Sequence, residues 1–345
     1  MDFIRPPDKK ENNTLNCSRT LLGLLFTMAI TSAMGQDSSP LELVKTIPLP
    51  RVNGRIDHMA FDIRHGRLLV AALGNGSVEV ISLKEGKVIH SVRGLHEPQG
   101  IACLPDVNTF VVATGGDGVC FFFDAELFQP AGTISLGDDA DNIRYDDTAH
   151  LLYVGYGSGA LAVIDPSTKK KLADIPLAGH PESFQLEQNG GRLFVNVPQT
   201  EQIAIVQRAS HNVVGKIDLR DASGNFPMAV DQKHHRLFVG CRDPARLLIL
   251  TPDSGSVRTL AVDIDGDCDD VFFDEAARAI YISCGEGFLD VVTQAMADTY
   301  VLTSRIKTSV GARTSLFVPE LHQLFVAVPR RGSQSAAIRI YQTKE

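Results

Sequence analysis

A short run of apolar residues returns seven times along this chain, and its period constrains the fold more than any other feature. Each copy has a large apolar pair, then Val or Ile, then usually a small residue. The copies are Leu68–Ala71, Phe110–Ala113, Leu152–Gly155, Leu193–Asn196, Leu237–Gly240, Ile280–Ser283 and Leu324–Ala327. Their first residues are separated by 42, 42, 41, 44, 43 and 44 positions. A fixed period in this range is typical of repeat proteins, in which each copy is one supersecondary unit.

Each repeat contains the pattern of four short strands. In the third copy, residues 142–145, 151–156, 160–165 and 172–177 are rich in β-branched, aromatic or alternating apolar residues, and turns of Gly, Asp, Pro and Ser separate them. Strand-like runs bounded by such turns at intervals of about 8–12 residues indicate an all-β protein. No stretch after residue 35 sustains a helical period. Four strands per repeat at this spacing predict a β-propeller blade.

The two ends of the repeat array predict how the ring of blades closes. The last copy has the pattern for only three strands, the third ending near residues 337–342, whereas residues 42–50 resemble the fourth strand of the third copy. We therefore expect a seven-bladed β-propeller with four antiparallel strands per blade, in which strand 42–50 joins the last blade. Such a clasp covers two otherwise exposed sheet edges. Residues 42–345 then form a single domain, preceded by a linker over residues 36–41.

The first 35 residues have the pattern of a secretory signal peptide. Basic residues at positions 9, 10 and 19 precede the apolar run Leu21–Ile30, and small residues stand at −3 and −1 of a cleavage point before Gln36. We expect residues 1–35 to be removed there, giving a periplasmic or secreted protein. An uncleaved membrane anchor is the alternative, although the apolar run is short for a transmembrane helix, and no later segment is long enough to span.

The charge balance disfavours nucleic acid as a partner. The chain has a net charge of −8, and residues 1–35 hold four basic and three acidic residues, so their removal gives −9. A non-specific nucleic-acid binder gains its affinity by neutralising phosphates with Lys and Arg. The chain also has no Trp on which bases could stack. We expect a small molecule or a protein as the partner.

Five cysteines follow the predicted signal peptide, and they form neither a dense disulfide framework nor a CxxC motif. Cys241 and Cys284 end equivalent strands of adjacent repeats, and Cys268 lies between them. One disulfide among these three and a set of buried free thiols both remain open.

Two segments resemble a known family. Leu152–Asp165 resembles the YVTN-type repeat of YncE-like β-propellers, and Glu97–Ala102 resembles the "P-x-G-I-A" start of an inner strand in that family. The resemblance covers residues 42–345. It implies a propeller related to WD40-like folds in a protein of the kind that is commonly exported. Because the repeat motif is structural, the resemblance implies little about activity.

Polar residues that differ from blade to blade are expected at the mouth of the central channel. In a propeller, the loops leading into the first strands and the loops between second and third strands share one face. Alignment of the copies places the following residues there: Asp57, His58, Gln99, Asp141, Asn142, Glu182, Asp269, Asp270 and Arg313, with His96, Glu97, His180, Arg242, Arg246, Arg330 and Arg331 on neighbouring loops. Unlike groups that converge in this way predict a ligand site. The alternative is a solvated funnel whose carboxylates cap turns.

An acidic run before the sixth blade raises the question of a metal. Asp263, Asp265 and Asp267 stand just before Asp269 and Asp270. Oxygen-rich loops of this kind suit Ca²⁺, and an acidic turn without an ion is the alternative. A transition metal held by the imidazoles of His58, His96 and His180 is less favoured, because nothing in the sequence fixes their directions.

Two classes of function remain after the motif search. The chain lacks the GxSxG, HExxH, P-loop and CxxCH motifs. We expect a non-catalytic scaffold that binds a small molecule or a protein through the channel mouth. The alternative is a lactonase- or lyase-type enzyme acting on a sugar-derived substrate, with His58 as general acid or base, Asp57 or Glu182 as its partner and Arg313 as anion stabiliser. This alternative requires His58 beside a carboxylate in the channel mouth.

Overall fold

The structure is a computed structural model that describes residues 39–188, 190–252 and 258–344. The predicted signal peptide and the first part of the linker over residues 36–41 lie outside the described residues, so export of the chain stays a prediction. Within the described residues, no helix is both long and apolar enough to span a membrane.

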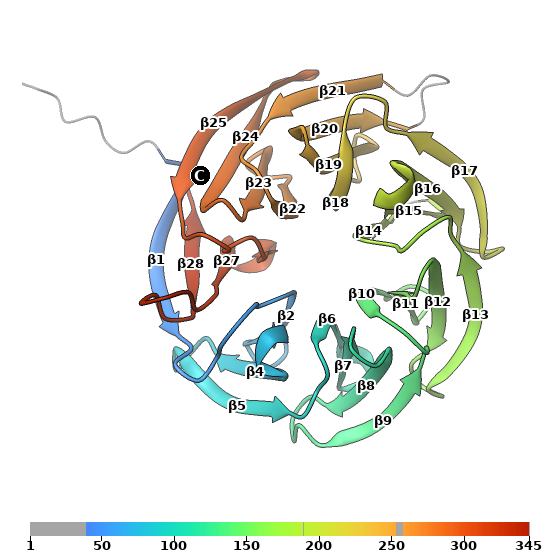
Figure 1. The fold of residues 1–345 in the computed structure, drawn as a ribbon, viewed down its shortest axis with the longest axis vertical. Helices are drawn as coiled ribbons and strands as arrows, with labels where there is room; N and C mark the ends of the chain where they lie inside the picture. The colour runs from blue at the N-terminus through green and yellow to red at the C-terminus, as the bar shows by residue number, and fades with distance from the viewer. Residues whose placement is uncertain (1–38, 189, 253–257, 345) are drawn as a thin grey trace, which may run out of the picture. The chain divides into compact units, whose positions relative to one another are not determined.

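The described residues form seven sheets of four antiparallel strands arranged in a ring (Figure 1). This arrangement confirms the seven-bladed β-propeller. The innermost strands are β2 Met59–Asp62, β6 Pro98–Leu104, β10 Ala140–Asp146, β14 Phe184–Leu186, β18 Ser223–Asp231, β22 Cys268–Asp274 and β26 Ser315–Val318. The second strands are β3 Arg67–Ala72, β7 Thr109–Thr114, β11 Leu151–Tyr156, β15 Arg192–Val197, β19 Arg236–Asp243, β23 Ala279–Cys284 and β27 Gln323–Val328. These second strands contain the seven apolar runs.

The outer half of each blade completes the pattern. The third strands are β4 Ser77–Ser82, β8 Val119–Asp124, β12 Ala160–Asp165, β16 Gln202–Gln207, β20 Ala245–Thr251, β24 Phe288–Met296 and β28 Ala337–Thr343. The outermost strands are β5 Lys87–Arg93, β9 Pro130–Ser135, β13 Lys170–Pro176, β17 Asn212–Asp218, β21 Arg258–Asp263, β25 Thr299–Lys307 and β1 Leu41–Pro48. The helical content of the described ranges is four short 3₁₀ turns, η1 Leu73–Asn75, η2 Pro105–Val107, η3 Pro198–Thr200 and η4 Pro319–Leu321.

The clasp closes the ring as the sequence predicts. Strand β1 pairs antiparallel with β28, from Leu41 opposite Thr343 to Pro48 opposite Ala337, so blade 7 has the order β1-β28-β27-β26. In Figure 1 the blue strand β1 lies on the outside of the red blade 7. Residues from opposite ends of the described chain therefore complete one sheet.

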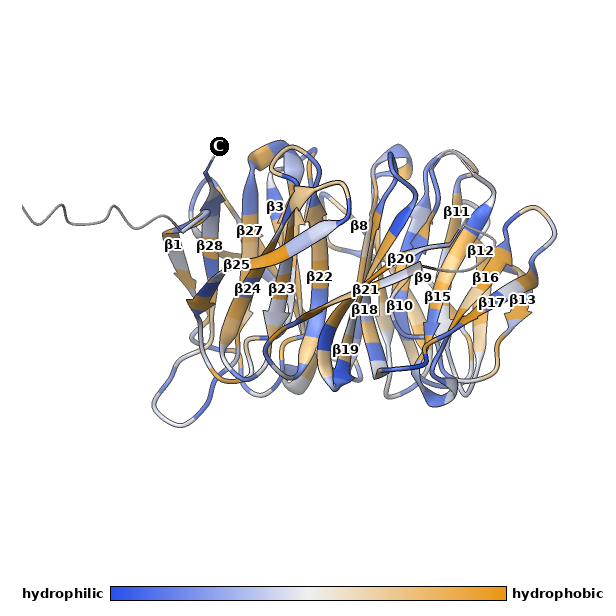
Figure 2. Ribbon diagram, turned by 90° about the horizontal axis from the view of Figure 1, so that it is seen from above, coloured by the Kyte–Doolittle hydropathy of each residue, from blue (hydrophilic) through white to orange (hydrophobic). Residues whose placement is uncertain are grey.

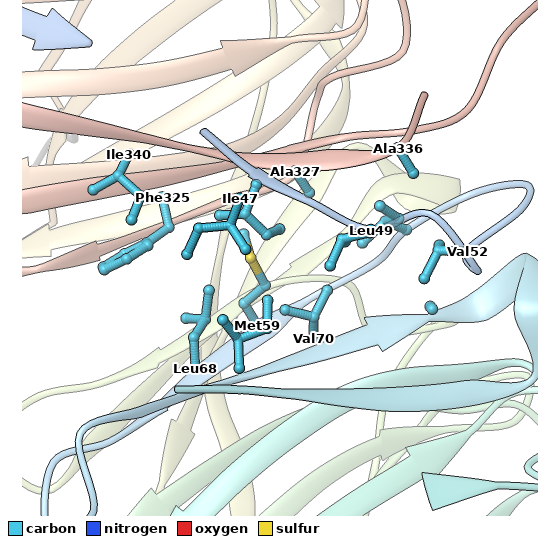
Figure 3. Close-up of a cluster of buried hydrophobic side chains, with 14 of the residues drawn as sticks. Ile47, Leu49, Val52, Met59, Leu68, Val70, Phe325, Ala327, Ala336 and Ile340 are labelled. Carbon is cyan, nitrogen blue, oxygen red and sulfur yellow. The ribbon is translucent and has the colours of Figure 1, made fainter. Parts of the chain in front are cut away.

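The hydrophobic core lies between neighbouring blades, in seven separate clusters. Each cluster packs one face of a blade against the next, because period-2 alternation gives a strand an apolar side chain on either face. Figure 2 shows orange hydrophobic residues along the strands and frequent blue residues in the loops at both ends. The cluster between blades 7 and 1 includes Ile47 from the clasp, Phe325 from β27 and Leu68 from β3, all fully buried (Figure 3). The clasp thus contributes packing as well as hydrogen bonds.

One glycine shows how tightly the innermost strands pack. A Cβ on Gly100 of β6 would lie 2.1 Å from the carbonyl oxygen of Asp141, which belongs to β10 of the next blade. Only a residue without a side chain permits this approach. The close contact fixes the backbone of Asp141 at the channel mouth.

The five cysteines in the described part of the chain are free thiols. Cys241, Cys268 and Cys284 are buried, and burial raises the pKa of each thiol. Of the two alternatives that the sequence left open, this structure has the buried free thiols and not the disulfide. The three thiols pack as small apolar groups.

Candidate functional site

A polar pocket of about 550 Å³ opens where the innermost strands of several blades begin. We call it the mouth pocket. Six of the ten ligand-binding residues predicted from the sequence line it, namely Gln99, Asp141, Glu182, Arg242, Asp269 and Arg313. They come from six different blades. Five of them stand near the start of an innermost strand, and Arg242 stands near the end of the second strand β19. The alignment of the repeats therefore brought together residues that are far apart in sequence.

The lining of the mouth pocket combines opposite charges. It includes five carboxyl groups, on Asp138, Asp139, Asp141, Glu182 and Asp269, and three guanidinium groups, on Arg55, Arg242 and Arg313. Convergent groups of both signs can bind a zwitterionic or strongly polar ligand and fix its orientation.

Asp269 organises the arginines at one side of the mouth pocket. Its Oδ2 lies 2.9 Å from Nε of Arg313, and its Oδ1 accepts a hydrogen bond from Arg242. The guanidinium of Arg242 also lies 3.8 Å from the ring centroid of Phe226 and donates to the carbonyl of Cys268. These contacts hold both arginines in fixed positions, as a preorganised site requires.

The other four predicted residues, Asp57, His58, Asn142 and Asp270, are not among the described residues that line the mouth pocket. They form a layer beside it. His58 Nε2 lies 3.6 Å from Asp57 Oδ1 and 3.9 Å from Asp141 Oδ1, and its Nδ1 lies 3.8 Å from Asp270 Oδ1. His58 therefore has the neighbouring carboxylates that the enzyme alternative requires. Burial lowers the pKa of His58 below its ordinary value of 6.5, and the Asp57 carboxylate opposes this shift.

Two lining carboxyl groups have strongly perturbed pKa values. Burial raises the pKa of Glu182 to about 7, with the Asp269 carboxylate adding to the shift and His180 opposing it. Burial, with the charges of Asp57 and Glu182, holds the pKa of Asp141 well above its usual range. Asp141 therefore keeps its proton to a higher pH than an ordinary aspartate does, and Glu182 is divided between its acid and base forms near pH 7. Among the described residues, the buried Oδ1 of Asp141 has no hydrogen-bond partner.

The raised pKa of Glu182 predicts a pH-dependent stability. Unfolded, this carboxyl titrates near 4.5, and folded it titrates near 7, so between these values only the folded protein keeps the proton. The resulting stabilisation is complete below pH 4.5 and is lost as the pH rises through 7. From pH 5 to 8 we expect the free energy of unfolding to fall more steeply for the wild type than for Glu182→Gln, by on the order of 3 kcal/mol. Chemical denaturation of both proteins measures this difference.

The exposed Glu126 provides the control for that experiment. Glu126→Gln should follow the wild-type pH dependence, because its removal changes no buried carboxyl. Parallel curves for the wild type and Glu182→Gln would show that the Glu182 carboxyl titrates alike in the folded and unfolded states.

Several residues of the site were absent from the predicted set. Arg55 lines the mouth pocket and pairs with Asp57 at 2.7 Å, and Asp139 accepts a hydrogen bond from Gln99 at 3.2 Å. Arg144 lies beside the pocket on β10 and donates to the carbonyl of Ile143 at 2.8 Å. Both arginines stand two residues from a predicted position, Asp57 or Asn142. Asn142 and Arg144 both lie on β10, where the period of two along a strand could have found Arg144. Arg55 lies in the loop before β2, where that period does not apply.

The predicted metal ligands do not come together. Asp263 pairs with Arg246 at 2.9 Å, Asp265 with Arg305 at 2.6 Å and Asp267 with Arg313 at 2.8 Å. Three carboxylates facing three different guanidiniums do not form the oxygen cage that Ca²⁺ binds. The residues described contain no group of three or more His, Cys, Asp or Glu side chains placed to hold a metal. His58, His96 and His180 therefore form no such group either.

A second cavity of about 550 Å³ lies between the clasp and β5, away from the channel. Its lining includes Glu79, whose carboxylate already accepts hydrogen bonds from Ser77 and Ser91. The other titratable groups in its lining are basic (Arg51, Lys87, His90 and Arg93), so carboxyl groups do not converge there as they do in the mouth pocket. The mouth pocket is therefore the candidate site for chemistry.

The fold and the mouth pocket together define a seven-bladed β-propeller with a charged site at one end of its channel. Several solved structures share this fold. The chain is similar to the hydrazine synthase of Kuenenia stuttgartiensis, with 17% identity and a TM-score of 0.74 over 86% of this chain and 97% of that one. It is similar to a chain of the mitotic checkpoint complex, with 12% identity and a TM-score of 0.75 over 94% and 99% of the two chains. The Cps50 (Swd1) β-propeller domain of Myceliophteria thermophila matches at 10% identity and a TM-score of 0.66, over 88% and 100%. At these identities the likeness concerns the fold alone.

A family model provides the finer assignment. The model described as glutamine cyclotransferase matches residues 60–237, which is more than half of the chain, so the chain belongs to the glutamine cyclotransferase family. No curated protein matches the chain. The resemblance to YncE-like propellers rests on the repeat motif and stays a prediction.

Proposed function

We propose that the mouth pocket cyclises the N-terminal glutamine of a peptide. The observation that carries the proposal is the position of Glu182, a half-buried carboxyl that lines the mouth pocket among fixed charges and whose pKa is raised to about 7. Membership of the glutamine cyclotransferase family supports the choice of reaction. A group whose pKa lies near the working pH is suited to general acid–base catalysis.

The reaction needs one proton acceptor and one proton donor. The neutral α-amine attacks the carbon of the γ-carboxamide, and a new C–N bond closes a five-membered lactam. The C–N bond to the amide nitrogen then breaks, and that nitrogen leaves as ammonia. The α-amine loses a proton and the leaving nitrogen gains one. The carboxylate of Glu182 can take the first proton and return it to the leaving nitrogen, so that the enzyme ends unchanged.

Asp141 has the properties of an oxyanion donor for this reaction. Negative charge develops on the carboxamide oxygen as the amine attacks. A carboxyl kept neutral by burial can donate a hydrogen bond to that oxygen. Because Asp141 lines the mouth pocket and has a raised pKa, its acid form can donate this bond.

The remaining charges can orient the peptide. Asp138 and Asp139 lie in the loop before β10 and line the same pocket, where their carboxylates can hold the substrate's ammonium group until it deprotonates. Arg242 and Arg313, held by Asp269, can bind the peptide's carbonyl oxygens. The chain's own residues thus supply binding, orientation and proton transfer.

The direct test is incubation of the purified protein with a peptide that begins with glutamine. Ammonia release and the loss of one ammonia from the peptide mass are expected at equal rates, above the rate of spontaneous cyclisation. A peptide that begins with asparagine, which would need a four-membered ring, provides the negative control. The absence of any rate above the spontaneous one would exclude the proposal.

The scaffold and lactonase alternatives predict different results when the purified protein is tested for peptide binding, glutamine cyclisation and lactone hydrolysis. Saturable binding of a peptide or another small molecule without turnover of any substrate would favour the non-catalytic scaffold. Hydrolysis of sugar lactones without ammonia release from glutamine peptides would favour the lactonase type, with His58 rather than Glu182 as the first residue to replace.

A further inference from the structure

A smaller cavity of about 270 Å³ adjoins the mouth pocket and has a different charge. Four arginines line it, Arg55, Arg313, Arg330 and Arg331, and we call it the arginine subsite. Arg55 and Arg313 also line the mouth pocket. Because the two cavities share these side chains, a ligand seated in one can extend into the other.

The arginine subsite has a surplus of positive charge. Asp267 is the one carboxylate among the described residues that line it, against four guanidiniums. Arg55 and Arg313 also pair with Asp57 and Asp269 outside the lining, so Arg330 and Arg331 carry the positive surplus. Asp267 is already engaged, at 2.8 Å from Arg313 and 3.6 Å from Arg242. The subsite therefore favours an anionic ligand group, whereas the mouth pocket combines both signs.

Backbone contacts position the two arginines that belong to the subsite alone. Arg330 donates to the carbonyls of Pro50 and Val52, at 2.8 and 3.2 Å, and these bonds leave its charge unneutralised. Arg331 is exposed, and its guanidinium lies over Gly311, where a Cβ would come within 2.8 Å of Nε. Gly311 has a φ of +83°, which also favours glycine. The backbone at this position leaves room for the guanidinium of Arg331.

We propose that the arginine subsite binds the side-chain carboxylate of an acidic residue that follows the N-terminal glutamine of the substrate. This inference rests on the proposed function of the mouth pocket and names the class of peptide that the site prefers. A carboxylate matches the planar fork of a guanidinium and forms charge-assisted hydrogen bonds to it. The shared Arg55 and Arg313 place these bonds next to the bound glutamine.

Two peptides with amidated C-termini test the preference, Gln-Asp-Ala-Ala and Gln-Asn-Ala-Ala. The amide excludes binding through a terminal carboxylate. With wild-type protein, we expect kcat/KM to be about tenfold or more higher for the acidic peptide, mainly through KM. Arg331→Gln should remove most of this preference, chiefly by raising KM for the acidic peptide. Arg220→Gln removes the charge of another exposed arginine, outside the lining of both cavities, and should keep the preference.

Binding to Glu182→Gln separates this inference from the proposed reaction. Calorimetry with the same two peptides needs no turnover. Tighter binding of the acidic peptide, weakened by Arg331→Gln and by added salt, supports the subsite even where no ammonia is released. Equal affinity, or equal kcat/KM, for the two peptides overturns the inference even where cyclisation is observed. An acidic preference that survives in Arg331→Gln at full size also overturns it.

Discussion

Replacing Glu182 with glutamine is expected to lower kcat for cyclisation of a glutamine peptide by about 10²–10⁴-fold. The amide keeps the size and hydrogen-bonding capacity of the side chain but cannot take a proton from the α-amine. In the wild type, kcat/KM should rise as the pH passes through about 7, because the base form of Glu182 is the active form. This limb should be absent in Glu182→Gln, whereas the limb from the substrate's own amine should remain.

The exposed Glu126→Gln is the matched control, and it should retain wild-type kcat and the wild-type pH profile. Ammonia release measured from about pH 5.5 to 9 gives the pH profiles of the wild type, Glu182→Gln and Glu126→Gln. Over this range a carboxyl with a pKa of about 7 and an amine with a pKa of about 8 both titrate. A Glu182→Gln variant with wild-type kcat would assign the proton transfer to another group, and His58 would be the next candidate.

Replacing Ile47 with alanine is expected to lower the free energy of unfolding by about 2–5 kcal/mol. Ile47 lies on the clasp and is 0% exposed, in the cluster that joins blades 7 and 1. Truncation removes apolar contacts with both blades and leaves a cavity that the surrounding strands fill only in part. Urea denaturation, monitored by far-UV circular dichroism, measures the change.

Leu43→Ala is the control for the clasp, since Leu43 lies on the same strand but is 49% exposed. Its truncation should change the free energy of unfolding by less than about 0.5 kcal/mol. A loss for Ile47→Ala as small as that for Leu43→Ala would mean that the packing of β1 against blade 1 contributes little. The hydrogen bonds of β1 to β28 would then account for closure.

The fold could be predicted from the sequence because each blade repeats the same apolar run. The seven runs became the seven second strands, and the predicted clasp over 42–50 corresponds to β1 Leu41–Pro48. The pattern is local: alternating residues between turns define a strand whether or not its partners are known. Closure of the ring could be predicted by counting strands. The last blade had only three predicted strands, and the predicted strand over residues 42–50 belonged to no other blade.

The site could be predicted only in part, because its contacts cross between blades. Alignment placed Asp141 and Glu182 correctly, since both stand at the start of an innermost strand. It could not reveal that Arg242 of one blade would hold Asp269 of the next, because that pairing depends on side-chain directions. The side-chain directions in the acidic run at 263–270 could not be foreseen either, since its first three aspartates face different arginines.

The pairing of β1 with β28 has a consequence for the order in which the ring can assemble. Strand β1 precedes blades 1 to 6 in the chain, and its partner β28 is the last strand of the described residues. At about 5–20 residues per second, the roughly 300 residues between them take about 15–60 s to synthesise. During that time the face of β1 that includes Ile47 can pack only against blade 1, because blade 7 does not yet exist. Blades 1 to 6 can form one after another as they emerge, but the ring itself cannot exist before the final strand. The ring is therefore timed by the synthesis of β28 and not by the appearance of the first blade.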